Sequence, residues 1–177
     1  MALRDIHLLG SAVLREAAAE VAAVDDEVRA FIDDLFETMD AADGVGLAAN
    51  QVGETRRVAV VDAEGQRIAM VNPRIVEASG RATQEEGCLS IPELYAEVTR
   101  AATVQLEALD REGNPYTLDA EGLLARAIQH EIDHLDGILF LDHLSPLKRQ
   151  LMVARFKREN KGLGITRKVT PDASTPA

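Results

Sequence analysis

The sequence predicts an α+β fold, in which short and mostly antiparallel strands pack around a central metal-binding helix, with one further helix toward each end of the chain. Two groups of short β-type runs are each joined by tight turns, which favours antiparallel pairing. Two stretches place apolar side chains three and four residues apart, as helices do, and Ser145-Pro146 can begin a third helix. The middle helical stretch also contains the pattern His-Glu-x-x-His at residues 130–134.

The composition of the chain is that of one globular domain. It has 177 residues, of which 46% are hydrophobic and 28% charged. We expect a single domain over residues 1–165 and a disordered tail over residues 166–177. The single cysteine, Cys88, excludes an intrachain disulfide and fits a reducing compartment. Neither a signal-like leader nor an apolar run of about 20 residues is found, so we expect a cytoplasmic protein that does not enter membranes.

The charge of the chain is acidic overall but uneven. A net charge of −11 repels the phosphate backbone, so we expect no specific DNA binding. Residues 145–168 differ from the rest, with eight Lys or Arg and one acidic residue. This basic segment indicates either a local anionic partner or the solvated face of a helix, and the sequence leaves both open.

The first helix is predicted over residues 24–42. Asp25 or Asp26 is placed to cap its start, and Asp43-Gly44 ends it. Its apolar residues recur at helical spacing and should form one buried face: Val28, Phe31, Ile32, Leu35, Phe36 and Met39.

The stretch that follows, GVGLAANQVG at residues 44–53, is too rich in small residues to predict a regular element. It fits the pattern Gly-x-Gly-x-x-Ala of dinucleotide-binding loops. That pattern requires a strand before it and a helix after it, so that phosphate meets a helix N-terminus. Here a helix precedes and a strand follows, so we interpret the glycines as room for a substrate against the backbone.

The strands fall into two groups, separated by a predicted loop with the sequence QEEGCLSIP. A hairpin turn at residues 63–66 joins the first two strands, and a turn at residues 110–114 precedes the last one. The predicted strands are residues 57–62, 68–72 and 74–77 in the first group, and residues 97–100, 102–109 and 116–118 in the second.

The second helix is predicted over residues 120–135, ended by Gly137. Its face carries Leu123, Ala127, His130 and His134. Two imidazoles one turn apart can share an ion, and the intervening glutamate can handle a proton. The alternative is a pair of hydrogen-bonded core histidines.

Residues 138–141 are a short strand or a packed turn. Ser145-Pro146 begins the third helix as N-cap and first residue, and that helix spans residues 145–160.

A catalytic site of this type needs a third protein ligand beside the two histidines. The extended protease pattern with a third histidine fails, because Phe140 stands at that position and His143 comes three residues too late. A downstream glutamate is the next option, but nothing around Glu159 marks it as a ligand. Cys88 remains, preceded by Gly87, and a thiolate is a good ligand for zinc or ferrous iron.

Three motifs of the chain resemble the signature motifs of the peptide deformylases. They are GVGLAANQVG, EEGCLS and QHEIDHLDG, in that order, and the resemblance extends over essentially the whole chain. It implies a metal-dependent hydrolase that removes the formyl group from the N-terminal formylmethionine of nascent polypeptides. It also implies that Cys88, His130 and His134 hold the metal, commonly Fe²⁺, with Zn²⁺, Ni²⁺ or Co²⁺ able to occupy the site.

The same resemblance implies roles for residues around the ion. Glu131 would act as general acid and base while hydroxide held by the metal attacks the formyl carbon. The Gln51 side chain and the Leu89 backbone N–H would stabilise the oxyanion. Gly46 would contact the substrate through its backbone carbonyl.

The methionine side chain needs an apolar slot, for which Val45, Leu123 and Ala127 are candidates by position. Arg126, next to the histidine face, is expected either to rim this pocket or to reach solvent. In the family, a basic C-terminal helix such as residues 145–160 can contact the ribosome. The alternatives to a deformylase are another metal-dependent amidase or protease, and a metal- or peptide-binding module without catalysis.

Overall fold

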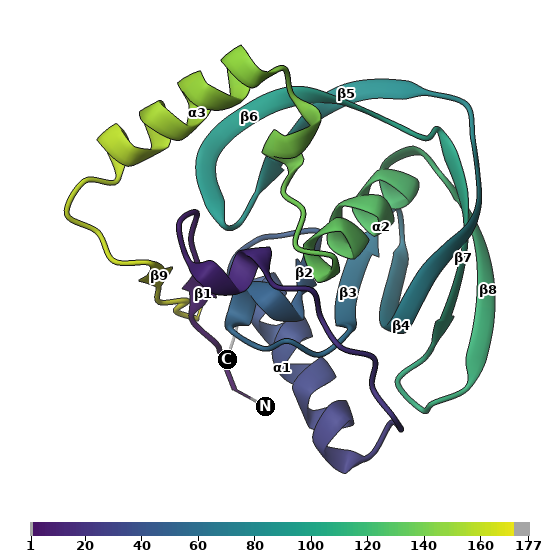
Figure 1. The fold of residues 1–177 in the computed structure, drawn as a ribbon. Coiled ribbons are helices and arrows are strands. Elements are labelled where there is room, and N and C mark those ends of the chain that lie inside the picture. Colours follow the sequence, from purple (N-terminus) through teal and green to yellow (C-terminus); the bar gives the residue numbers. More distant parts are fainter. Residues whose placement is uncertain (1, 172–177) are drawn as a thin grey trace.

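The structure is a computed structural model that describes residues 2–171 of the chain. Its α+β architecture confirms the predicted fold class, with one helix enclosed by antiparallel strands (Figure 1). The main sheet has the strand order β2-β3-β4-β7-β8, and all its neighbours are antiparallel. Its strands are β2 (Gly46–Ala48), β3 (Val58–Ala63), β4 (Gln66–Ser79), β7 (Thr103–Leu109) and β8 (Pro115–Glu121).

Two smaller antiparallel pairs complete the β structure. The hairpin of β5 (Ala82–Cys88) and β6 (Ile91–Arg100) arches over the enclosed helix in Figure 1. The other pair joins β1 (Ile6–His7) to β9 (Thr166–Arg167), so the two ends of the described chain lie side by side.

The three predicted helices are present, and their bounds differ from the predicted ones by no more than two residues. They are α1 (Asp26–Ala41), α2 (Gly122–Leu135) and α3 (Pro146–Glu159). Asp25 caps α1 by accepting a hydrogen bond from Val28 N–H at 2.9 Å. Ser145 caps α3 in the same way, with Pro146 as its first residue. None of the helices in the described range is long and apolar enough to cross a membrane.

The core has two parts that lie on either side of the site. In the larger part, α1 and α2 pack against β2 and β3 of the main sheet. The smaller part lies beneath α3, where Phe156 packs with Leu14, Ile91 and Phe140. Because α2 contributes to the larger core while the β5–β6 hairpin contributes to the smaller one, the boundary between the cores runs past the histidine face.

Two predictions of irregular structure are wrong. The stretch GVGLAANQVG contains strand β2 and a 3-10 helix, η2 (Ala49–Val52), and both are fully buried. The second predicted loop lies partly in strand β5, whose last residue is Cys88. In both cases tertiary pairing, with β3 and with β6 respectively, overrides a local composition that disfavours strands.

Two details of the predicted strands also change. Residues 68–72 and 74–77 form one strand, β4, because a shift in register between Val71 and Arg74 lets the pairing with β7 continue past Pro73. Asn72 takes a φ of +52° at this irregularity, and its side chain exchanges hydrogen bonds with the Val21 backbone. Residues 138–141, predicted as a strand or a packed turn, enter a 3-10 helix, η3 (Phe140–His143).

The predicted disorder of residues 166–177 is wrong for the first part of that tail. Thr166 and Arg167 pair with His7 and Ile6, and Leu8 N–H donates to the Ile165 carbonyl at 2.7 Å. This ladder satisfies the backbone groups that disorder would leave to water. Residues 172–177, to which the prediction also applied, lie outside the described residues.

Candidate active site

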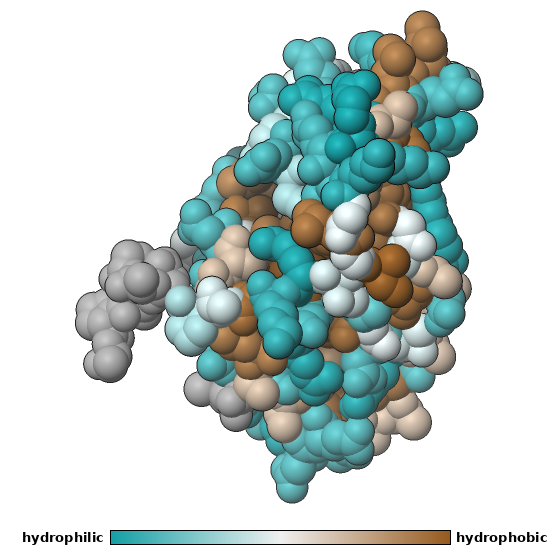
Figure 2. Space-filling view, turned by 90° about the vertical axis from the view of Figure 1, so that its left-hand side faces the viewer, coloured by the Kyte–Doolittle hydropathy of each residue, from teal (hydrophilic) through white to brown (hydrophobic). Residues whose placement is uncertain are grey.

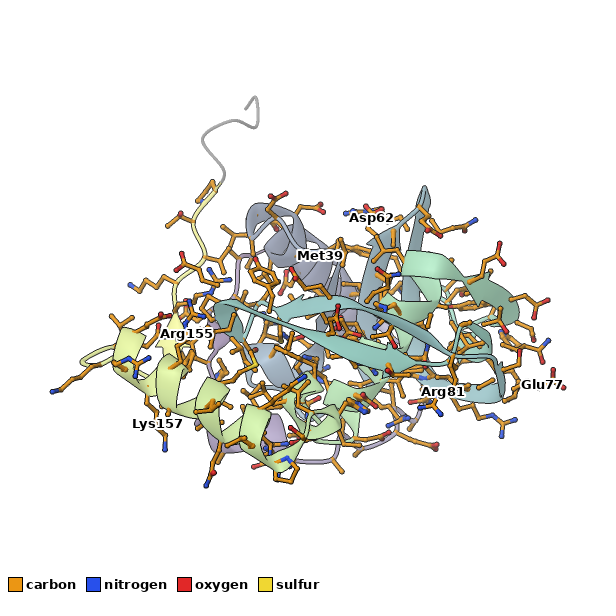
Figure 3. The ribbon with its side chains drawn as sticks, turned by 90° about the horizontal axis from the view of Figure 1, so that it is seen from above. Met39, Asp62, Glu77, Arg81, Arg155 and Lys157 are labelled. Carbon is orange, nitrogen blue, oxygen red and sulfur yellow. The ribbon has the colours of Figure 1, made fainter. Side chains whose placement is uncertain are left out.

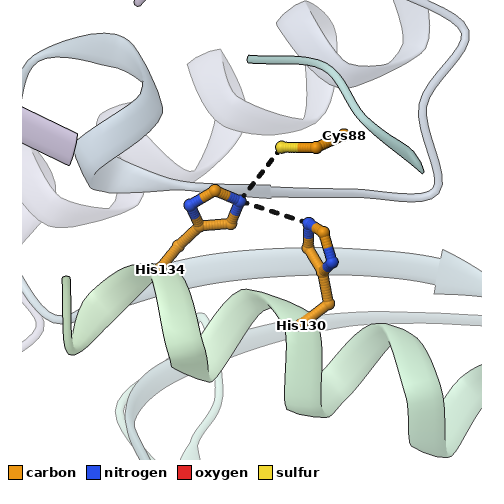
Figure 4. Close-up of side chains that lie close together, drawn as sticks. All are labelled: Cys88, His130 and His134. Carbon is orange, nitrogen blue, oxygen red and sulfur yellow. Dashed lines mark hydrogen bonds between the residues drawn. The ribbon is translucent and has the colours of Figure 1, made fainter. Parts of the chain in front are cut away.

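The three predicted metal ligands come together from two elements that are distant in the sequence. His130 and His134 project from successive turns of α2, and Cys88 reaches them from the end of β5 (Figure 4). Cys88 Sγ lies 3.3 Å from His134 Nε2, which lies 3.2 Å from His130 Nε2. Three potential donor atoms therefore face one point.

The donor set fits a divalent ion with borderline-soft preferences. Ion–sulfur bonds of about 2.3 Å and ion–nitrogen bonds of about 2.0 Å at tetrahedral angles separate the donors by roughly 3.3–3.6 Å. The observed separations are 3.2 and 3.3 Å, and all the donor atoms lie within 4.8 Å of one another. One thiolate and two imidazoles suit zinc, iron, cobalt or nickel far better than magnesium or calcium.

Glu86 holds His130 in orientation, and sequence reasoning gave it no role. Its carboxylate lies 2.9 Å from His130 Nδ1 and also accepts hydrogen bonds from Arg100 and Arg126. Burial raises the pKa of Glu86, but the hydrogen bonds from His130 and Arg100 lower it much further, so the group is ionised. With the carboxylate at Nδ1, Nε2 faces the other two potential donor atoms and could ligate an ion.

The buried network extends from Glu86 to Arg126 and, through Arg100 and Asp133, to His143. Arg126 is buried, neither at the rim nor in solvent, and it also donates to the carbonyls of Val98 and Ala82. His143, once an option as third ligand, instead bonds Asp133 at 2.7 Å. In the sequence, this network is indicated only by Glu86 near Cys88 and by Arg126 and Asp133 near the histidines.

The two histidines differ in their electrostatics. Burial lowers the pKa of His134 well below its ordinary value, so that side chain is neutral and ready to ligate. Burial also lowers the pKa of His130, but the carboxylate of Glu131 and the partners Cys88 and Glu86 raise it more.

Glu131 lies beside the donor cluster and is 3% exposed. A Cβ atom built on Gly46 would lie only 2.8 Å from Glu131 Cδ, so the glycine makes room for this carboxyl. Burial raises the pKa of Glu131 to about 7, against the lowering influence of the His130 and Arg100 charges. Such a carboxyl can take up and return a proton near neutral pH. A cation beside it would lower this value.

Gln51 is buried and fixed in orientation by three neighbours. Its Oε1 accepts a hydrogen bond from Ala48 N–H at 3.0 Å, and its Nε2 donates to Ser90 Oγ at 3.1 Å. The same Nε2 lies 3.6 Å from Cys88 Sγ, so an amide N–H is directed at the ligand cluster. Leu89, one residue beyond Cys88, lines the pocket next to it.

A pocket of about 470 Å³ opens beside the donor cluster. The residues predicted for the methionine slot, Val45, Leu123 and Ala127, all line it. Val45 and Leu123 are about half exposed, which leaves them available to a ligand. Lining residues that sequence reasoning missed include Asp43, Glu85, Glu93, Tyr95 and Arg167.

The strand beside this pocket has a free edge. β2 is the edge strand of the main sheet, and Asp62 N–H donates to the Val45 carbonyl at 2.8 Å. Since hydrogen bonds alternate along an antiparallel pair, the N–H and C=O of Gly46 point away from β3. An extended peptide can pair with such an edge.

Comparison with known proteins gives one family. A sequence model of the family described as “Polypeptide deformylase” matches residues 3–150. A curated peptide deformylase of Alkalilimnicola ehrlichii is 53% identical over 154 residues, covering 85% of this chain and 86% of the relative. Another, of Brucella suis biovar 1, is 48% identical over 164 residues, covering 89% of this chain and 94% of the relative.

Solved structures give the same result. A peptide deformylase of Legionella pneumophila is 45% identical with a TM-score of 0.85, covering 89% of this chain and 95% of that one. A peptide deformylase of Ehrlichia chaffeensis in complex with actinonin is 37% identical with a TM-score of 0.87, covering 91% of this chain and 99% of that one.

Proposed function

The chain belongs to the polypeptide deformylase family of hydrolases, and from this premise we propose how it acts. It removes the formyl group from the N-terminal formylmethionine of nascent polypeptides and releases formate. One observation carries this proposal: Cys88, His130 and His134 converge at a pocket, with the proton-handling carboxyl of Glu131 beside them.

The substrate peptide binds in extended form along the free edge of β2. The carbonyl of Gly46, which points away from β3, accepts a hydrogen bond from the substrate backbone. The methionine side chain enters the slot of Val45, Leu123 and Ala127. A formyl group carries hydrogen where larger acyl groups carry carbon, so a close-fitting site disfavours those groups.

The residues around the cluster divide the chemistry between them. When bound to Cys88, His130 and His134, a divalent ion supplies the Lewis acidity that makes water a competent nucleophile near neutral pH. Glu131 accepts the proton of the attacking water and delivers it to the leaving amine. The Gln51 amide and the Leu89 backbone N–H stabilise the oxyanion that forms on the formyl oxygen.

We propose Fe²⁺ as the resident ion, with Zn²⁺, Ni²⁺ and Co²⁺ able to replace it. Thiolate and imidazole donors suit all four ions, so the donor set alone does not select among them. The choice of Fe²⁺ follows the family resemblance. Because Cys88 would bind Fe²⁺ as a thiolate, the protein with its ion should be sensitive to oxygen. Purification without air is therefore part of the test.

We propose that the basic helix α3 contacts the ribosome. The enzyme would then act in the cytoplasm, where new chains emerge. Figure 3 shows α3 along the outside of the molecule, carrying Arg155 and Lys157. Lys148, Arg149, Arg155 and Lys157 are all exposed, although Arg155 pairs with Glu159 and Arg149 lies 4.0 Å from Asp142. The face in Figure 2 mixes hydrophilic and hydrophobic side chains, and exposed Leu147 and Leu151 lie on α3 as well.

The ribosome contact is tested by reversing charge on α3 rather than by removing the helix. Truncation would also remove Phe156 from the smaller core and strand β9 from its pairing with β1. A Lys148→Glu, Lys157→Glu protein should bind ribosomes more weakly and with less salt dependence, while turnover of short peptides is unchanged. Unchanged, salt-independent binding would remove the ribosome from the proposal.

The proposed reaction is tested on protein purified without air. We would measure its bound metal and its release of formate from a formyl-Met peptide and from the acetyl counterpart. Fast release from the formyl peptide alone, lost on chelation, is the expected result. Cleavage of acetylated or internal amides would indicate a different amidase, and one bound ion without turnover would indicate a binding module.

A further inference from the structure

The C-terminal strand β9 brings a basic side chain to the candidate active site. Arg167, in β9, lines the same pocket as Glu131 and the ligands Cys88 and His130. It lies beyond residue 150, where the family match ends, and within the segment that composition predicted to be disordered. No role in the proposed chemistry has been given to it.

The pairing of β9 with β1 fixes the direction of this side chain. Arg167 lies opposite Ile6, and the Leu8–Ile165 hydrogen bond extends the pairing by a further link. Side chains alternate between the two faces of a strand. Arg167 and Val169 are partly buried while Thr166 and Lys168 are exposed, and Val169 packs on the larger core. The face that carries Arg167 is therefore the inner one.

Arg167 has hydrogen-bonding capacity to spare. Its Nε is buried, and among residues 2–171 no acceptor bonds it and no carboxylate pairs with the guanidinium. The other arginine that lines the pocket, Arg126, is saturated by Glu86 and two backbone carbonyls. A guanidinium that lines a pocket without a carboxylate partner can donate to an acceptor that enters the pocket.

We propose that Arg167 is a substrate-binding residue, which donates hydrogen bonds to a backbone carbonyl of the peptide beyond its methionine; this rests on the proposed function. We choose a backbone carbonyl rather than an acidic side chain of the substrate because the pocket is lined by acidic residues. Asp43, Glu85 and Glu93 line the same pocket and repel an acidic substrate residue. A backbone carbonyl is present in every nascent chain and carries no such penalty.

The test compares substrates with and without residues after methionine. We would measure kcat and KM for formyl-Met amide and for formyl-Met-Ala-Ser amide with the wild type, Arg167→Ala and Arg167→Lys. Loss of one charge-assisted hydrogen bond should raise KM for the longer substrate about tenfold in Arg167→Ala. Its kcat, and KM for formyl-Met amide, should be unchanged. Arg167→Lys keeps the charge but loses the planar set of guanidinium donors, so its KM for the longer substrate should lie between those of the wild type and Arg167→Ala.

Lys168→Ala is the matched control, because it removes the same charge from the exposed neighbour on the same strand. It should leave both KM values unchanged. An equal rise for both substrates, or a fall in kcat together with a lower melting temperature, would show that Arg167 only holds β9 in place. An unchanged KM for the longer substrate would also overturn the proposal.

The role of Arg167 can be tested even if the proposed deformylase function is wrong. If the wild type releases no formate from either substrate, the proposed function fails. Calorimetric binding of intact formyl-Met-Ala-Ser amide to the same variants then tests Arg167 directly. Affinity lost in Arg167→Ala and kept in Lys168→Ala would support a peptide-binding role, and equal affinities would exclude it.

Discussion

Single residues at the site act through a small number of buried polar contacts. Glu131 has a raised pKa because it is buried, and it is accommodated because residue 46 has no side chain. His130 presents Nε2 to the cluster because Glu86 occupies its other nitrogen. These dependencies make two separable predictions, one about turnover and one about affinity for the ion.

Glu131→Gln should keep the ion and lose most turnover. The amide preserves the shape beneath Gly46 but cannot exchange a proton, and such general acid–base contributions are worth roughly 10²–10⁴-fold in rate. Formate release and metal content measured on the same sample provide the check. Cys88→Ala is the contrasting variant, because it should lose affinity for the ion itself. Full occupancy and activity in Cys88→Ala would refute the proposed ligand set.

Glu86→Gln should weaken both the ion site and the fold. The change leaves Arg100 and Arg126 buried against a neutral partner, which costs about 3 kcal/mol of stability. Weaker orientation of His130 should reduce affinity for the ion by roughly 10- to 100-fold. Chelator competition and urea denaturation measure the two effects. Glu85→Gln, an exposed neighbour, is the control and should change neither of them.

At the scale of elements, the C-terminal end of α2 is fixed by contacts from other parts of the chain. Its C-terminal turn leads into η3, where Asp142 accepts hydrogen bonds from Leu139 N–H and from Arg15 of the 3-10 helix η1 (Ala12–Arg15). Gly137, with a φ of +77°, lets the chain leave α2 close to the Arg15 carbonyl. The position of the histidine face therefore depends on the N-terminal segment.

Asp142→Asn should lower stability in a pH-dependent way. Burial raises the pKa of Asp142, but hydrogen bonds from Arg15 and Leu139 lower it further, so the net shift is downward. Its contribution is present above the ordinary pKa of about 4 and is lost as the pH falls through the lowered folded value. We expect a deficit of about 1 kcal/mol at pH 7 that shrinks toward pH 3. Urea denaturation at stepped pH measures it, and a pH-independent deficit would contradict this account.

At the scale of the whole molecule, much of the site follows from local sequence and some of it does not. The face of α2 that carries His130 and His134 was predictable because helical spacing is a local property. The network around Glu86 was not, because its partners lie 14 to 44 positions along the chain and only folding brings them together. The buried strand β2 and the pairing of β9 with β1 likewise depend on distant partners rather than on local composition.

Removal of a bound ion should destabilise the entire domain, because the proposed ligands join the β5–β6 hairpin to α2. An ion at about 1,000 times its dissociation constant adds roughly 4 kcal/mol to the free energy of unfolding. For a domain of this size, that corresponds to a melting temperature lower by about 8–16 °C after chelation. Calorimetry with and without a chelator measures the shift. Cys88→Ala should melt at the same temperature under both conditions, and a chelator-sensitive Cys88→Ala protein would contradict this account.

The pairing of β1 with β9 has a consequence for the order in which the enzyme becomes complete during its own synthesis. Strand β1 precedes all the other described elements in the chain and must wait for β9, which follows them. Contacts between residues so far apart in the chain form slowly, because a long loop must close first. A chain released early, after His134 but before Arg167, would already contain every proposed ligand of the ion. It would still lack Arg167, which lines the pocket beside those ligands.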